Sequence, residues 1–250
     1  MDDKKHLVRF FIGDIRDRER LYRAFVGVDC VIHCAALKNI AATEYNPSET
    51  VKTNTVGAMN IIDAAIDRGV GKVLAISTDK AVNPISLYGA AKLCADKLFI
   101  AANNYGETKF SVIRFGNFEG SRGSVIPLFT ELAKQNAKTI PITDFRMTRF
   151  WISIEDAAKR TLQALGLMNG GEIFAPKMKI ESIRSLASRL CPNTKQKEIG
   201  IRDGEKLYEE LILIGEAKRT ISTKDFYITY PKEPQWGDRV PHDFCYNSKL

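Results

Sequence analysis

The sequence predicts an α/β fold built on a parallel sheet, with a smaller and closely packed C-terminal lobe. Short apolar runs rich in β-branched residues alternate with longer segments of helical periodicity. Residues 28–33 are apolar on both faces, which is typical of a strand buried inside a parallel sheet. Alternating strands and helices of these lengths are joined by right-handed crossovers. The strands are therefore expected to end at one common edge.

The alternation is regular in the first half of the chain. The predicted strands are residues 8–12, 28–33, 72–77 and 110–115. The predicted helices are residues 17–25, 53–68 and 86–104; a loop through Asn39 and Pro47 leads into the second helix, and Gly69 ends it.

After Asn117 the alternation loosens. A helix is expected after Pro127, another over residues 154–168, and a short strand over residues 172–175. No repeat and no Ser- or Pro-rich linker separates independent domains. We therefore assign residues 1–118 to the sheet domain and residues 119–250 mainly to the smaller lobe, with residues 152–176 returning to the sheet.

Composition excludes several protein classes. The 250 residues are 44% hydrophobic and 27% charged, so the chain is neither collagen-like nor disordered and can bury a sizeable core. The most apolar stretch, residues 24–37, is interrupted by Asp29 and His33 and is too short for a membrane span. The first five residues do not resemble a secretory signal. We expect a cytoplasmic protein.

Cysteine content and charge indicate which kinds of site and ligand are expected. The five cysteines lack a C-x-x-C pair and are expected to be reduced and mostly buried. The three histidines are not near paired cysteines, so no metal site is expected. The net charge of +7 is dispersed among acidic residues, which favours a phosphorylated small ligand over nucleic acid.

The segment after the third predicted strand can carry chemistry. Thr78, Asp79 and Lys80 follow residues 72–77, at the edge where ligands of open α/β sheets bind. Tyr88 and Lys92 are four residues apart on the next helix and share one face. An ammonium beside Tyr88 would lower the tyrosine pKa, as removal of a proton from a sugar alcohol by a hydride-transfer enzyme requires.

Two alternatives are less specific. A bare tyrosine and lysine at this spacing are more often a solvated pair on an amphipathic helix, although the preceding strand and polar triplet favour a catalytic pair. Asp79 and Lys80 can form an acid and base pair if both point into the site, or they can be a charged turn before Pro84.

Several motifs together resemble a known family. They are residues 13–17 (GDIRD), 33–38 (HCAALK), 44–47 (EYNP), 53–54 (TN), 77–92, 114–117 (RFGN), 120–125 (GSRGSV), 147–150 (MTRF) and 201–206 (IRDGEK). The chain resembles the inverting UDP-N-acetylglucosamine 4,6-dehydratases, which are extended short-chain dehydrogenase/reductase enzymes of bacterial surface-glycan and pseudaminic acid synthesis. The Tyr-x-x-x-Lys motif marks only the superfamily, whereas Thr-Asp-Lys, MTRF and IR-x-GEK point to this subgroup.

The resemblance implies a Rossmann-like sheet and a redox-neutral reaction. NADP, with NAD as the other possibility, oxidises the sugar at C4; water is eliminated across C5 and C6; the hydride returns to C6 with inversion at C5. By this resemblance Tyr88, held by Lys92, takes the C4 hydroxyl proton, while Thr78 orients the hydroxyl. Lys80 removes the C5 proton and Asp79 protonates the departing C6 hydroxyl.

The same resemblance implies the binding residues. The cofactor would contact Asp14, Ile15, Ala35, Ala36, Asn54, Tyr88, Lys92 and Phe118. UDP-N-acetylglucosamine or a related UDP-sugar would contact Lys38, Thr78, Asn117, Thr143, Met147, Arg202 and Glu205. Without the resemblance, Arg202 and Glu205 could equally form a surface ion pair. A homo-oligomer is expected, without nucleic acid or membrane as a partner.

The chain departs from the family pattern in several places. Nothing before Val8 resembles the glycine-rich strand–helix unit that holds the cofactor pyrophosphate, so we expect an N-terminally truncated sheet with two badly covered strand edges and little turnover by this chain alone. Asn39, Ala41, Phe118, Glu119 and Asp203 also depart from the pattern, and Glu119 should face solvent or pair with Arg122. The alternatives are a nucleotide-sugar 4-epimerase and a non-catalytic remnant that binds UDP-sugar.

Overall fold

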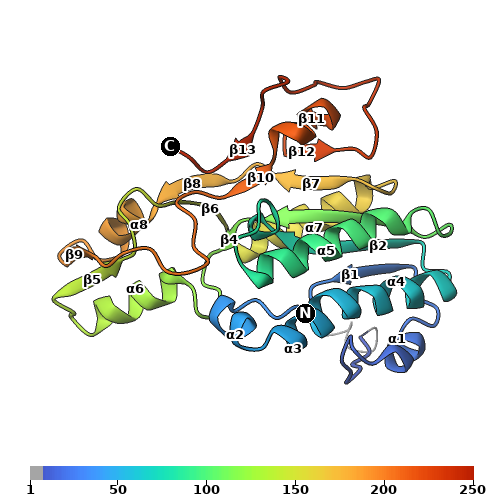
Figure 1. Cartoon of the computed structure of the whole chain (residues 1–250), viewed down its shortest axis with the longest axis horizontal. Helices are drawn as coiled ribbons and strands as arrows, with labels where there is room; N and C mark the ends of the chain where they lie inside the picture. The colour runs from blue at the N-terminus through green and yellow to red at the C-terminus, as the bar shows by residue number, and fades with distance from the viewer. Residues whose placement is uncertain (1–7) are drawn as a thin grey trace.

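In the computed structural model, which describes residues 8–250, a six-stranded sheet forms the centre of the molecule (Figure 1). Its strand order is β1-β2-β3-β7-β12-β11. The strands β1 (Cys30–His33), β2 (Lys72–Thr78), β3 (Lys109–Phe115) and β7 (Ile173–Pro176) are parallel. Strand β12 (Phe226–Thr229) is antiparallel to β7, and β11 (Thr220–Ser222) is antiparallel to β12. The predicted α/β class with a parallel sheet is confirmed.

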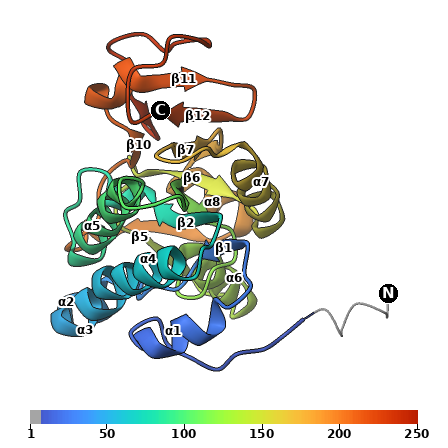
Figure 2. The same ribbon diagram turned by 90° about the vertical axis from the view of Figure 1, so that its right-hand side faces the viewer.

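Helices cover both faces of the sheet (Figure 2). On one face α1 (Arg18–Ala24), α4 (Gly57–Asp67) and α5 (Leu87–Ala102) share a core with β1, β2 and β3, centred on Phe99 and Phe110. On the other face α7 (Ile154–Leu167) packs with Leu74 and Ile113. Burial of these apolar side chains is the main force that fixes the layers.

The smaller lobe lies at the end of the sheet where β2 and β3 finish (Figure 1). It contains the sheet β4 (Asn117–Phe118), β6 (Thr148–Ile152) and β8 (Lys179–Ser182), the pair β5 (Thr139–Ile142) and β9 (Lys195–Glu198), and the helices α6 (Val125–Lys134) and α8 (Ile183–Leu190). Phe129, Ile140 and Leu186 form its core. A further pair, β10 (Glu210–Ile212) and β13 (Tyr246–Asn247), joins the last part of the chain to the lobe.

The N-terminal third differs from the prediction. Residues 8–12 form no strand, because no strand among residues 8–250 lies beside them to complete a ladder, and Phe10 and Ile12 are almost fully exposed. The predicted loop through Asn39 contains α2 (Ile40–Tyr45), whose first turn is capped by the Asn39 side chain. The next helical run begins earlier than predicted: α3 (Pro47–Val51), a π-helical turn (Lys52–Val56) and α4 follow one another without a break.

The prediction that the cysteines are mostly buried is wrong. All five thiols are free, but only Cys191 is buried, whereas Cys30, Cys34 and Cys94 are exposed. Cys30 and Cys34 lie on or just after β1, and within residues 8–250 this strand pairs only with β2. An edge strand leaves such side chains uncovered, although the apolar run predicts burial on both faces.

Residues 1–7 lie outside the described part, and with them the charged N-terminal segment and His6. No helix of residues 8–250 has the length and apolar character that a bilayer crossing requires. The same residues contain no group of three or more His, Cys, Asp or Glu side chains arranged to hold a metal ion.

Candidate active site

The site begins where β2 ends and the chain makes a 3-10 turn, η3 (Asp79–Ala81). Thr78 caps this turn: its hydroxyl accepts a hydrogen bond from the backbone N–H of Lys80 at 3.3 Å and donates one to Asp79 Oδ1 at 3.1 Å. The Asp79 side chain is fully buried, and its Oδ2 atom has no hydrogen-bond partner among the described residues. Local capping therefore aims a carboxyl group inward, so Asp79 is not part of a solvated turn.

Lys80 points to the same place. Its Nζ donates to Asp79 Oδ1 at 2.9 Å and to Asn117 Oδ1 at 3.2 Å, and 26% of the side chain remains exposed. Burial opposes the charged form, but the Asp79 carboxylate and then Glu209 outweigh it and raise the pKa of Lys80. Lys80 is therefore an ammonium ion paired with Asp79 in this structure.

A glycine allows α5 to pack directly on the η3 turn. Ser86 caps the helix by accepting from the Gly89 backbone N–H at 3.2 Å. A Cβ atom at Gly89 would lie 2.2 Å from the carbonyl oxygen of Lys80, which no side chain can tolerate. The absence of that atom lets the first turn of α5 bring Tyr88 beside the Asp79–Lys80 pair.

Tyr88 and Lys92 are both buried, but the pKa of Tyr88 shifts in the direction opposite to the prediction. Burial raises the pKa of Tyr88, while Lys80 and the Thr78 hydroxyl act in the opposite direction. Burial lowers the pKa of Lys92, whose Nζ donates to the Ile76 carbonyl at 2.8 Å. The expected lowering of the Tyr88 pKa by Lys92 is wrong for this structure, because Lys80 is the cation that acts on the phenol and burial outweighs it.

The structure brings only some of the predicted substrate residues to this pair. Asn117 accepts the hydrogen bond from Lys80, as described above. Gly204 packs against Ser86 at the start of α5, which places residues 202–205 over that helix end. Arg202 is exposed, and the buried Oε2 atom of Glu205 has no hydrogen-bond partner among the described residues, so the alternative of an ion pair between them is not found.

Of the other predicted substrate residues, Thr143 and Met147 lie in the smaller lobe and Lys38 lies in the loop after β1. Thr143 donates a hydrogen bond to the Met147 sulfur at 3.3 Å, and Met147 belongs to the core of that lobe. Lys38 is exposed, and its Nζ donates to the Arg122 carbonyl at 3.1 Å. Glu119 faces solvent, as one of its two expected arrangements requires.

The predicted cofactor residues follow β1. The Asn54 amide group accepts from the Leu37 N–H and donates to the Leu37 carbonyl, both at 2.8 Å, and so holds the loop that contains Ala35 and Ala36. Ala35 is exposed and Ala36 is half-buried. The Asn54 side chain is thus occupied by the backbone and not free for a ligand.

The remaining three predicted cofactor residues have mixed surroundings. Asp14 is exposed and paired with Arg16 at 2.8 Å, which lowers the pKa of Asp14. Ile15 packs against α4, where a Cβ at Gly57 would meet its Cδ1 at 2.7 Å. Phe118 stacks on Phe115 with ring centroids 5.3 Å apart. Ile15 and Phe118 are therefore partly committed to the core.

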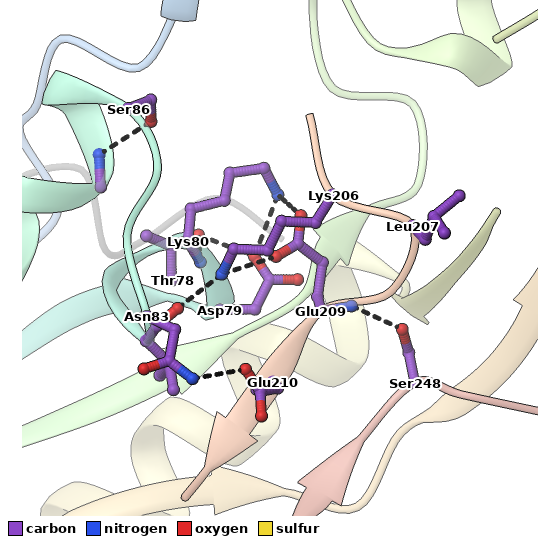
Figure 3. Close-up of polar contacts among 12 residues, drawn as sticks. Thr78, Asp79, Lys80, Asn83, Ser86, Lys206, Leu207, Glu209, Glu210 and Ser248 are labelled. Atoms are coloured by element: carbon purple, nitrogen blue, oxygen red, sulfur yellow. Dashed lines mark hydrogen bonds and ion pairs between the residues drawn. The ribbon is translucent and has the colours of Figure 1, made fainter. Parts of the chain in front are cut away.

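Three charged residues absent from the predicted set complete the site: Arg149, Lys206 and Glu209, of which Figure 3 shows Lys206 and Glu209 beside Lys80. The charged atoms of Glu209 lie 3.8 Å from those of Lys80, 3.6 Å from Lys206 and 3.9 Å from Arg149. Arg149, Lys206 and Glu209 all belong to the second half of the chain. Lys206 also donates to the Val82 carbonyl at 2.6 Å. The MTRF and IR-x-GEK motifs contain Arg149 and Lys206, but no sequence pattern marks the burial of Glu209.

The arrangement can transfer protons to and from one bound molecule. A phenol, an amine and a carboxyl group come from the β2–η3–α5 junction, with a second carboxylate behind them. Among the described residues, the turns after β1 and β2 contain no glycine, so they offer no glycine-rich cradle for a phosphate.

Comparisons with known proteins agree with this chemistry. A family model described as "Polysaccharide biosynthesis protein" matches residues 1–231. The UDP-N-acetylglucosamine 4,6-dehydratase (inverting) of Campylobacter jejuni is 53% identical over 227 residues, which cover 90% of this chain and 68% of the relative. The UDP-glucose 4-epimerase of Rickettsia conorii is 41% identical, over 88% of this chain and 66% of the epimerase.

Solved structures are similar over most of the chain. Pen from Bacillus thuringiensis has a TM-score of 0.89 and 38% identity, and the match covers 98% of this chain and 77% of that one. A dTDP-glucose 4,6-dehydratase from Streptomyces venezuelae, solved with NAD bound, has a TM-score of 0.75 and 26% identity over 82% of this chain and 71% of that one.

Proposed function

Because the chain belongs to the polysaccharide biosynthesis protein family, we propose that it is a UDP-N-acetylglucosamine 4,6-dehydratase that inverts C5. The observation that carries the proposal is the ion pair between buried Asp79 and half-buried Lys80 beside Tyr88. Oxidation of an alcohol requires one base, whereas elimination of water also requires an acid for the leaving hydroxyl and a base for the neighbouring C–H. This site contains all three groups.

Each residue has one role in the proposed cycle. A nicotinamide cofactor, when bound, accepts a hydride from C4 and later donates it to C6. Tyr88, in the phenolate form that Lys80 and the Thr78 hydroxyl favour, takes the C4 hydroxyl proton, and the ketone formed at C4 makes the C5 hydrogen acidic. Thr78, whose hydroxyl lies at the Asp79 carboxyl, orients the sugar hydroxyl.

Proton transfer within the pair prepares the elimination. A proton moves from Lys80 Nζ to Asp79 Oδ1 along their 2.9 Å hydrogen bond, which leaves a neutral amine and a carboxylic acid. Lys80 then takes the C5 proton, and the C–H electrons form the C5=C6 double bond. The C6–O bond breaks, Asp79 gives its proton to the hydroxyl, and water leaves. The pair ends as the same ion pair. When the hydride returns to C6, C5 takes a proton from solvent and Tyr88 releases its proton to solvent, so protons balance over the cycle.

The residues present fit one end of a nicotinamide cofactor. Tyr88 and Lys92 are buried where β2 ends, and Asn54 fixes the loop after β1 that would lie along the ribose. The turns after β1 and β2 lack the glycines that bring backbone N–H groups against a pyrophosphate. We therefore assign Tyr88, Lys92 and the loop held by Asn54 to the nicotinamide–ribose end and no described residue to the pyrophosphate.

A nucleotide-sugar 4-epimerase is the second candidate, since relatives of that description reach 42% identity. An epimerase needs the tyrosine but no elimination acid and base. Lys80→Ala separates the two: a dehydratase loses exchange of the C5 proton, whereas an epimerase keeps most of its rate. Lys97→Ala, an exposed lysine on α5, is the matched control.

The test of the proposal is conversion of UDP-N-acetylglucosamine in D₂O with NADP⁺ or NAD⁺, followed by proton NMR. The expected product is the 4-keto-6-deoxy sugar with solvent deuterium at C5, formed at the low rate expected of this chain by the unmodified protein and by Lys97→Ala, but not by Lys80→Ala. Formation of the C4 epimer, or equal C5 exchange in both lysine variants, would contradict it.

Finer points are proposals that rest on the resemblance. We propose NADP in preference to NAD, a role in pseudaminic acid synthesis, a cytoplasmic homo-oligomer, and a division into a dinucleotide-binding domain over residues 1–118 and a substrate lobe over residues 119–250. Titration with each cofactor by calorimetry, and light scattering of the purified chain, test the first and third of these.

A further inference from the structure

Glu209 is held in the site by the last residues of the chain. Its backbone N–H donates to the Ser248 hydroxyl at 2.9 Å, and its carbonyl accepts from the Ser248 N–H at 2.8 Å. Ser248 is fully buried and donates to the Thr148 carbonyl at 3.2 Å, next to Arg149. The position of Glu209 is therefore fixed by β6 and by the return of the chain through β13, not by local sequence.

The Glu209 carboxylate is buried among charges without a hydrogen bond to its Oε2 atom. The side chain is 3% exposed, and Oε2 has no hydrogen-bond partner among residues 8–250. Burial and then Asp79 raise the pKa of Glu209, while Lys80, Arg149 and Lys206 lower it. A carboxylate desolvated in this way is costly unless the surrounding charges compensate it, and such groups occur preferentially at functional sites.

We propose that Glu209 is a positioning residue of the elimination site, whose buried carboxylate keeps the proton shared by Asp79 and Lys80 bound to that pair at neutral pH. This inference rests on the proposed function. The Glu209 carboxylate lies 3.8 Å from Lys80 Nζ and favours the ammonium form of Lys80, as the Asp79 carboxylate does at 2.9 Å. Without Glu209, only one of these two negative charges would remain. A pair that lost its proton could no longer form the acid that releases the C6 hydroxyl.

The charged and titratable groups around Lys80 come from several elements. They are Asp79 from η3, Tyr88 from α5, Arg149 from β6, and Lys206 and Glu209 from the segment before β10. Arg149 opposes the effect of Glu209 on Lys80, and Lys206, 3.6 Å from Glu209 Oε2, offsets part of the Glu209 charge. Removing Glu209 and removing Lys206 should therefore change the proton affinity of Lys80 in opposite directions.

Competitive acetylation reports the fraction of Lys80 that is a neutral amine, and it needs neither substrate nor turnover. The full chain is treated with trace acetic anhydride at pH 8, and acetylation of Lys80 is measured by mass spectrometry. Glu209→Gln should increase the rate about tenfold, because loss of this negative charge lowers the pKa of Lys80 and makes the neutral amine more abundant. Glu210→Gln is the control, because the Glu210 carboxylate accepts a hydrogen bond from Asn83 at 2.7 Å and is not paired with Lys80. This variant should leave the acetylation rate of Lys80 within about twofold of that of the unmodified chain.

Lys206→Met keeps the test decisive if Glu209→Gln perturbs the fold. Loss of this cation should lower the acetylation rate of Lys80 several-fold, whereas a loosened fold would raise it in both variants. Equal rates in the unmodified chain and Glu209→Gln, or a rise in Lys206→Met, would overturn the inference. Absence of ketone product from the unmodified chain would instead overturn the proposed function, because the acetylation result does not depend on it.

Discussion

The contact between α5 and the η3 turn can be tested at Gly89. In Gly89→Ala the new Cβ would lie 2.2 Å from the Lys80 carbonyl oxygen and 3.0 Å from the Pro84 Cβ. The Lys80 oxygen is backbone, so it cannot rotate away, and the helix must move by about 1 Å. Overpacking of this kind costs about 3 kcal/mol. The reduced freedom of the unfolded chain returns up to about 1 kcal/mol, which leaves a net loss of about 2 kcal/mol.

Gly166→Ala is the matched control. Gly166 lies on α7 with nothing within 4 Å of a Cβ, so the same substitution should stabilise the chain by about 0.4–1 kcal/mol. Urea unfolding of both variants measures the difference. The rate of elimination should also fall about 100-fold in Gly89→Ala, because Tyr88 moves relative to Lys80. Equal or greater stability of Gly89→Ala than the unmodified chain would refute the packing argument.

Three further substitutions test other buried groups. Burial and then Lys92 lower the pKa of His33 from its ordinary value of 6.5 to about 3. Between these two pH values, His33 binds a proton in the unfolded chain but not in the folded one. Stability should fall by about 1 kcal/mol per pH unit from pH 6.5 towards 3, and urea titrations of His33→Phe should lack this slope. Asn54→Ala should cost about 2 kcal/mol, measured by thermal unfolding, because two backbone groups lose their partners. Arg114→Met leaves two buried carboxylates unpaired and should cost about 3–5 kcal/mol, whereas a loss below about 1 kcal/mol would show that water replaces the arginine.

The parts of the fold that depend on local pattern could be predicted. The strand over residues 72–77 and the helix that carries Tyr88 have periodicity and caps that the sequence contains, so the junction between them was predictable to within a residue or two. Residues 8–12 have an equally apolar pattern, yet they form no strand. A strand needs a neighbouring edge, and a sequence pattern gives no information on whether that edge is present.

The site residues that follow directly from the predicted strands could also be predicted, whereas those that depend on tertiary packing could not. Asp79 and Lys80 follow a predicted strand directly, so their position at the sheet edge follows from topology. Glu209 enters the site through hydrogen bonds with Ser248, whose hydroxyl in turn donates to the Thr148 carbonyl. Both residues are far away in the sequence, so the burial of Glu209 depends on tertiary packing alone. Asn54 shows the opposite case: it occurs in a recognised motif, but its amide holds the backbone of Leu37.

The fate of a label at C4 tests most directly whether the three groups at the β2–α5 junction eliminate water from a hexose. UDP-N-acetylglucosamine deuterated at C4 is incubated in ordinary water with the chain and oxidised cofactor, and the product is analysed by NMR. Transfer of the deuterium from C4 to C6, with solvent hydrogen at C5, is the result this mechanism requires. Deuterium found again at C4, in either configuration, would contradict it.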